Sequence, residues 1–167
     1  MENGLTLVKI GRSERLERLL PQALDGLRLS ELPPEEVAAA AGRRLLFAVS
    51  IDTYGPGEDF TRLLRLLRQT PGGLRGCFGG VIVDGEGELY TKQAARDLIL
   101  AANLAGCAFP GKPLTEGTGS LYNQHIQANR LHLSWEQTYC WQIRQLAERL
   151  QSFLLPKFER PKLLMLH

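Results

Sequence analysis

Residues 45–68 have the sequence LLFAVSIDTYGPGEDFTRLLRLLR, which joins a short apolar run, a polar loop and a helical pattern. The run Leu45–Ile51 is continuously apolar, as is typical of a parallel strand covered on both faces. Two glycines and a proline follow within residues 52–57, and apolar residues then recur at helical spacing from Asp59 to Gln69. The stretch predicts a strand at the centre of a parallel sheet, followed by a loop and a helix.

The same order of strand, loop and helix recurs on both sides of this stretch. Ser13 is the expected N-cap of the first helix, and Ser134 with Gln137 fits a capping box for the last. This alternation predicts an α/β fold with five parallel strands, right-handed crossovers and helices on both faces. Strands are expected at Leu5–Ile10, Leu27–Leu29, Leu45–Ile51, Val81–Val83 and Lys112–Glu116, with helices beginning near Glu14, Pro33, Asp59, Thr91 and Trp135.

The length of 167 residues predicts a single main domain. We assign residues 1–155 to it, and we expect residues 156–167 to be a linker and the start of a further strand or domain. The net charge of +2 does not indicate nucleic acid, and no apolar run is long enough to span a membrane. Three widely spaced cysteines without a CxxC pair indicate free thiols, so we expect a cytoplasmic protein.

Familiar catalytic and metal motifs are absent from the sequence. The segment Gly106–Lys112 has the spacing of a P-loop, but Pro113 stands where a Ser or Thr should bind magnesium, and a helix precedes it where a strand is needed. The three histidines show no HExxH spacing, so no metal site is predicted. Arg62, Arg65 and Arg68 share one side of a helix, and we interpret them as a solvated face.

The candidate site is inferred from where loops lie and not from a motif. Loops at the carboxyl ends of parallel strands lie at one edge of the sheet, where ligands are usually held. Four loops are expected there, namely 11–13, 50–57, 84–90 and 116–120. They supply glycines, hydroxyl groups and the rings of Tyr54 and Tyr90, which suit a planar, polar ligand better than acid–base chemistry. Asp84 could instead begin a turn or cap a helix, and the glycines could serve only the turns.

The order of elements around LLFAVSID, DTYGPGEDFTRLLRLLR, GGVIVDG and TKQAARDLILAANLAG resembles the flavodoxin-like fold, a three-layer sandwich with strand order 2-1-3-4-5. More narrowly, it is similar to NAD(P)H-dependent FMN reductases. The resemblance implies a homodimer that binds FMN at the carboxyl edge and uses NAD(P)H, and it identifies no catalytic residue. The cofactor-binding residues implied are Arg12, Ser13, Ser50, Asp52, Thr53, Tyr54, Gly55, Asp84, Gly85, Glu86, Gly87, Tyr90, Gly117 and Thr118.

The loop after the first strand leaves a second hypothesis open. Members of this family hold the FMN phosphate in a Ser- or Thr-rich loop at a helix N-terminus, whereas here that loop is only Gly11-Arg12-Ser13-Glu14. The chain also resembles the N-terminal half of longer flavodoxin-family proteins, whose second half would begin near PKLLMLH. The alternative function is therefore a flavin-free domain that serves dimerisation or interaction with a second flavodoxin-like domain.

Overall fold

A computed structural model describes residues 4–85, 88–116 and 128–155 of the chain. Five parallel strands form one sheet in the order β2-β1-β3-β4-β5. The predicted α/β class and the 2-1-3-4-5 strand order are confirmed. The strands are β1 (Leu5–Ile10), β2 (Leu29–Glu31), β3 (Arg44–Ser50), β4 (Phe78–Asp84) and β5 (Leu114–Glu116).

Strand β3 lies at the centre of the sheet, where it pairs with β1 on one side and β4 on the other. Its residues are buried as far as Val49, and only Ser50 at the carboxyl end is half-buried. Leu45, Phe47 and Val49 belong to the core on one face, whereas Leu46 and Ala48 belong to the core on the other. The unbroken apolar run therefore reflects a strand that is covered on both faces.

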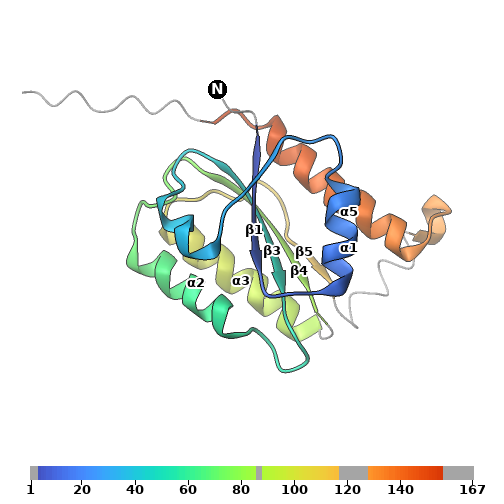
Figure 1. The fold of residues 1–167 in the computed structure, drawn as a ribbon, viewed down its shortest axis with the longest axis horizontal. Helices are drawn as coiled ribbons and strands as arrows, with labels where there is room; N and C mark the ends of the chain where they lie inside the picture. Colours follow the sequence, from blue (N-terminus) through green and yellow to red (C-terminus); the bar gives the residue numbers. More distant parts are fainter. Residues whose placement is uncertain (1–3, 86–87, 117–127, 156–167) are drawn as a thin grey trace, which may run out of the picture.

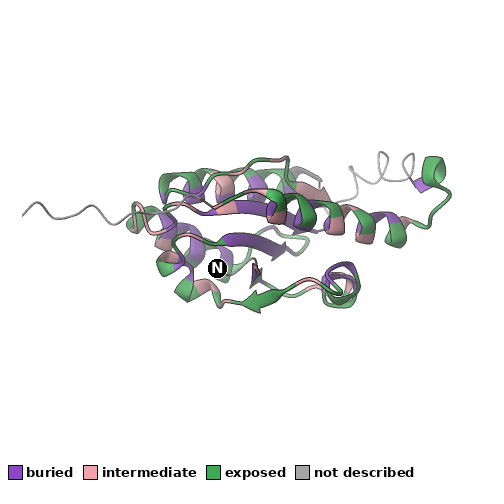
Figure 2. Ribbon diagram, turned by 90° about the horizontal axis from the view of Figure 1, so that it is seen from above, coloured by how far each residue is buried: buried purple, intermediate pink, exposed green. Residues whose placement is uncertain are grey.

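Helices cover the sheet on both faces and complete three layers (Figure 1). One face is covered by α1 (Glu14–Ala23) and α5 (Trp135–Ser152), and the other by α2 (Glu58–Gln69) and α3 (Glu88–Leu104). Figure 2 shows the buried residues gathered in the strands between these layers. Ser134 caps α5 through the predicted capping box with Gln137.

The connection from β2 to β3 differs most from the prediction. Strand β2 lies two residues later than expected, because the Leu27 N–H donates to the Leu24 carbonyl in a turn and pairing with Leu5 begins only at Leu29. The short helix that follows is the 3₁₀ helix η1 (Pro34–Ala39). A 3₁₀ segment of this length covers less of a sheet than an α-helix of several turns. In keeping with this, all three residues of the edge strand β2 are exposed, and Lys9 is the one exposed residue of β1.

The cysteines are free thiols, and two of them are buried. Burial raises the pKa of Cys77, whose thiol donates to the Ala40 carbonyl over 2.9 Å. Burial also raises the pKa of Cys107, with the neighbouring Cys77 adding to the shift. These thiols are core residues with little thiolate character, so they are not candidates for nucleophilic catalysis.

The glycine pair Gly79-Gly80 lets the segment after α3 approach β4 on one face and α5 approach it on the other. A Cβ added at Gly79 would lie 2.5 Å from Cε1 of Phe109 and 2.9 Å from Sγ of Cys107. A Cβ added at Gly80 would lie 2.8 Å from Cδ1 of Leu150 in α5. No real Cβ is found at such distances, so the absence of side chains here is a packing requirement of the sheet.

We predict that Gly79→Ala lowers the free energy of unfolding by about 1–3 kcal/mol, because the ring of Phe109 and the thiol of Cys107 must both move. Urea denaturation followed by circular dichroism measures the change. Gly4→Ala is the matched control, since its added Cβ would make an ordinary 3.5 Å contact with the Arg28 carbonyl oxygen. Equal stability of the two variants would contradict the close approach at β4.

Candidate functional site

The carboxyl ends of β1, β3 and β4 lie side by side, as the sequence predicts. Ile10 pairs with Val49, and Ser50 at the end of β3 pairs with Asp84 at the end of β4. The Ile51 N–H also donates to the Asp84 carbonyl over 2.9 Å. The loops that follow these three strands therefore share one edge of the sheet.

The side chain of Asp84 lies at the N-terminus of α1. Its Oδ2 accepts a 2.5 Å hydrogen bond from the hydroxyl of Ser13, and its Oδ1 forms an ion pair with the Arg15 guanidinium. Ser13 is also the N-cap of α1, because its Oγ accepts from the Leu16 N–H over 3.3 Å. Asp84 is only 4% exposed. A buried carboxylate thus occupies the place where a helix N-terminus favours an anion.

Two aromatic rings of α5 lie against the guanidinium group of Arg15. Its guanidinium carbon lies 4.7 Å from the centroid of the Trp135 ring and 5.9 Å from that of Tyr139. Such stacking is favourable for a guanidinium and holds its plane. Nε of Arg15 is buried and makes no hydrogen bond with the described residues. The ion pair with Asp84 therefore joins α1, β4 and α5 at one point.

The loop between β1 and α1 is as short as the sequence indicates. Only three residues, Gly11 to Ser13, separate the two elements. Gly11 has φ +74°, and a Cβ added there would lie 2.5 Å from the Ser50 carbonyl oxygen. The loop is therefore held against the end of β3, and a residue with a side chain would be strained at this position.

The loop after β3 forms a tight turn rather than an open pocket. The Tyr54 N–H donates to Oδ1 of Asp52 over 2.9 Å, and the Gly55 N–H donates to the Asp52 carbonyl over 3.0 Å. Asp52 therefore serves the turn. The side chain of Tyr54 is 93% exposed and that of Tyr90 is 43% exposed. The Tyr90 ring lies beside the turn, because its Cδ1 would be 3.4 Å from a Cβ added at Gly55. The two tyrosines form a rim beside the turn.

The other predicted site residues divide into three groups. Gly85 is buried against Ile51, and Thr53 is exposed. Arg12 is exposed and has no hydrogen bond or ion pair among the described residues, so Arg15 rather than Arg12 balances the acid at this edge. Glu86, Gly87, Gly117 and Thr118 lie outside the described residues.

Sequence reasoning missed Arg15 and Trp135. Arg15 is two residues after the N-cap Ser13, and Trp135 is the first residue of α5, more than a hundred residues further along the chain. The available signal was the combination of a serine N-cap and an arginine in the first turn with an aspartate at the end of β4. An arginine placed there would be expected to meet an acid at the same edge.

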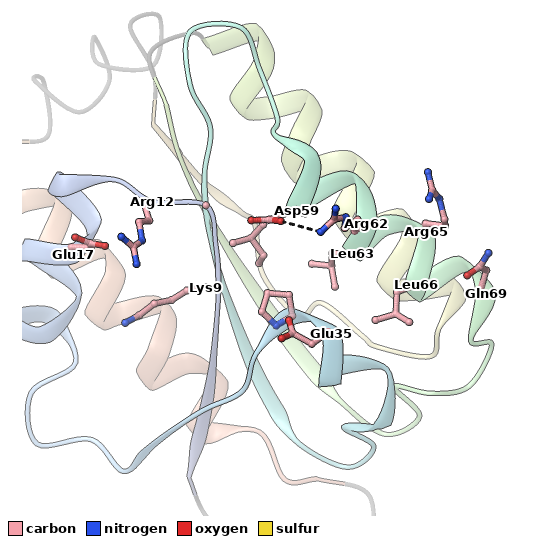
Figure 3. A pocket seen from close by; sticks show the side chains of 13 residues that line it. Lys9, Arg12, Glu17, Glu35, Asp59, Arg62, Leu63, Arg65, Leu66 and Gln69 are labelled. Carbon is pink, nitrogen blue, oxygen red and sulfur yellow. Dashed lines mark ion pairs between the residues drawn. The ribbon is translucent and has the colours of Figure 1, made fainter.

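A groove lies between the end of β1, η1 and α2 (Figure 3). Its volume is about 1070 Å³, and Leu63 and Leu66 of α2 contribute apolar surface to it. Neither Asp84 nor either tyrosine of the rim lines it. Because cations and acids line the groove in similar numbers, its charge does not select a phosphate. The charged lining residues are Lys9, Arg12, Arg62 and Arg65 with Glu17, Glu35 and Asp59.

The described ranges contain neither a membrane-spanning helix nor a cluster of metal ligands. None of the helices there combines the length and apolar character needed to cross a membrane. Within the same residues, no group of three His, Cys, Asp or Glu side chains could hold a metal ion.

Comparison with known proteins supports the fold. The chain is similar to a flavodoxin from Streptococcus pneumoniae, with a TM-score of 0.62 and 15% identity over 87% of this chain and 96% of the other. A short-chain flavodoxin associated with a bacterial microcompartment gives 0.59 and 16% identity, over 88% and 95% of the two chains. A mutant flavodoxin of Fusobacterium nucleatum bound to flavin mononucleotide gives 0.56 and 10% identity, over 87% and 95%.

Neither a protein-family model nor a curated protein matches the sequence. At identities of 10–16%, the similarity of the structures defines the fold and not the ligand. The chain therefore has a flavodoxin-like fold, as its sequence predicts.

The described residues do not fit the phosphate of FMN. At the start of α1, the Ser13 hydroxyl and the Arg15 guanidinium already hold Asp84, so a phosphate would meet a buried carboxylate in the same place. Two like charges so close together are strongly unfavourable at a buried site. The short loop 11–13 also supplies few donors that could surround a phosphate from the other side. No chemical step through FMN is therefore derived for this chain.

We predict that Ser13→Ala lowers the free energy of unfolding by about 1–2 kcal/mol, because both the N-cap and the hydrogen bond to Asp84 are lost. Chemical denaturation measures the change. Arg12→Ala is the neighbouring control and should remain within about 0.5 kcal/mol of the wild type, as is usual for an exposed residue without a partner. A larger effect for Arg12 than for Ser13 would contradict the arrangement at this edge.

Proposed function

We propose that this chain is a flavin-free flavodoxin-like domain that serves dimerisation. The observation that carries the flavin-free part is the Asp84 carboxylate at the N-terminus of α1, bound by Ser13 and Arg15. The fold keeps its usual ligand-binding edge, but a side chain of the protein itself occupies the anion position. The function then depends on the outer surface of the domain.

The second candidate function is an NAD(P)H-dependent FMN reductase. The similarity to flavodoxins favours it, since one of these structures is described as bound to flavin mononucleotide. The exposed rim of Tyr54 and Tyr90 would suit a flat ring. This function requires Asp84 to leave Ser13 and Arg15 so that a phosphate can enter, and nothing in the described residues favours NAD(P)H.

The surface that supports dimerisation lies on α3. Leu100 is 51% exposed and Leu104 is 68% exposed, and their i, i+4 spacing places them on one side of the helix. A hollow of about 440 Å³ beside Leu100 is also lined by Ile99 and Pro113. The cations Lys92, Arg96 and Lys112 also line this hollow, so its apolar part is limited to Ile99, Leu100 and Pro113. We take the two exposed leucines beside it as the centre of a contact surface.

A second copy of this chain fits that surface. In an antiparallel pair of α3 helices centred on Leu100, Arg96 of one copy faces Leu104 of the other. The last turn of α3 contains no basic residue, so nothing in that turn balances its partial negative charge. The guanidinium of Arg96 would supply that balance, while its aliphatic stem covers Leu104. Because a two-fold axis repeats these contacts, one surface satisfies both copies.

We predict that the purified chain takes up no FMN, so that its Kd for FMN is weaker than about 1 mM. The reason is repulsion between the phosphate and the carboxylate of Asp84. Visible absorbance and isothermal titration calorimetry of the chain with FMN measure this. Riboflavin, which lacks the phosphate, is the control ligand: it meets no such repulsion, so FMN should bind no more tightly than riboflavin. Bound-flavin bands with FMN would favour the reductase function instead.

We also predict that the chain is a dimer by size-exclusion chromatography with light scattering, and that Leu104→Lys makes it a monomer. A lysine there places a like charge against Arg96 of the second copy and removes apolar contact. Leu154→Lys is the control, because Leu154 is 90% exposed outside α3 and its substitution should leave the dimer intact. A wild-type monomer would contradict self-association and favour a second flavodoxin-like domain as the partner.

A further inference from the structure

We infer that Asp84 is a built-in anion that fills a phosphate site at the start of α1, and that removing its carboxylate makes this site available to a phosphate group. The site consists of the Ser13 hydroxyl, the Arg15 guanidinium and the first turn of α1. The inference shares the assignment of Asp84 with the proposed function but does not depend on dimerisation.

The donors at this site are those that bind phosphate in proteins. A serine hydroxyl and an arginine guanidinium form short, charge-assisted hydrogen bonds with anions. The first N–H groups of a helix have no partner within the helix, and α1 with ten residues is long enough to carry a dipole. The Ser13 hydroxyl and the Arg15 guanidinium both donate to the Asp84 carboxylate, while the Ser13 oxygen caps the Leu16 N–H.

Asp84 leaves part of this donor capacity unused. Nε of Arg15 is buried and has no hydrogen-bond partner among the described residues, although the guanidinium pairs with Oδ1 of Asp84. A carboxylate offers two oxygens, whereas a phosphate group offers three or more acceptor oxygens. The arginine is therefore able to hold an anion with more acceptors than an aspartate provides.

Arg15 should remain in place when the carboxylate is removed. Its guanidinium is stacked on Trp135 and Tyr139, so its position does not depend on Asp84 alone. The acids in the first turn, Glu14 and Glu17, are exposed to solvent and are screened there. An Asp84→Ala variant would thus present a positioned cation and the Ser13 hydroxyl at the start of α1, without the buried carboxylate that opposes an anionic ligand.

A purely structural role for Asp84 gives a different expectation. If the ion pair only joins β4 to α1, its loss lowers stability equally in every buffer. If Asp84 takes the place of an anion, its loss lowers stability in chloride, and inorganic phosphate restores part of it. The response to phosphate therefore separates the two roles.

The experiment measures the melting temperature of the full chain in inorganic phosphate and in sodium chloride of equal ionic strength. The wild type should gain only the general stabilisation that phosphate gives any folded protein. For Asp84→Ala we expect a further increase of about 2–4 °C in phosphate, as binding to the folded state raises Tm. Asp84→Asn, which keeps the shape of the side chain, should respond in the same direction. If Asp84→Ala is unfolded in chloride, phosphate should recover its folded circular dichroism spectrum.

The double variant Asp84→Ala with Arg15→Gln is the control and should lose the response to phosphate. FMN should then stabilise Asp84→Ala more than riboflavin does, because only FMN carries the phosphate. Equal Tm values in phosphate and chloride for both Asp84 variants would overturn the inference. A Tm increase in phosphate as large for the wild type as for the Asp84 variants would also overturn it. Flavin uptake by the wild type would overturn the flavin-free function instead, so the two failures are distinguishable.

Discussion

The ion pair between Asp84 and Arg15 organises the carboxyl edge of this protein. It joins the end of β4 to the first turn of α1, and the aromatic rings of α5 hold the arginine from the other side. Removing one partner of a fully buried pair costs about 3–5 kcal/mol, and the 29% exposure of the Arg15 side chain makes the cost lower here. The same contact places a buried carboxylate at the N-terminus of α1.

A second departure from a fully covered sheet lies beside β1. Strand β2 has three residues, and the crossover to β3 contains only the 3₁₀ helix η1. The groove of about 1070 Å³ lies between this helix, the end of β1 and α2. Its charged lining residues are four cations and three acids, and they do not include Asp84 or Arg15. The protein thus combines a flavodoxin-like sheet with a short 3₁₀ crossover beside β1 and a buried ion pair at the start of α1.

The fold could be predicted from the sequence because β3 and β4 contain the uninterrupted apolar runs Leu45–Val49 and Val81–Val83, and because Ser13 and Ser134 mark the starts of α1 and α5. Strand β2 was misplaced by two residues, because three exposed residues at the edge of a sheet have no hydrophobic pattern. The edge that carries the site was also predictable. The pairing of Asp84 with Arg15 could not be predicted from the sequence, because a contact between residues 69 positions apart depends on the orientation of two side chains.

The central claim is that Asp84 occupies the phosphate position of the wild-type protein. A crystal structure of the wild type grown in the presence of FMN tests it most directly. The account predicts the Asp84 carboxylate between Ser13 and Arg15, with no phosphate at the start of α1. A structure in which the FMN phosphate contacts Ser13 and Arg15, with the side chain of Asp84 turned away, would contradict it.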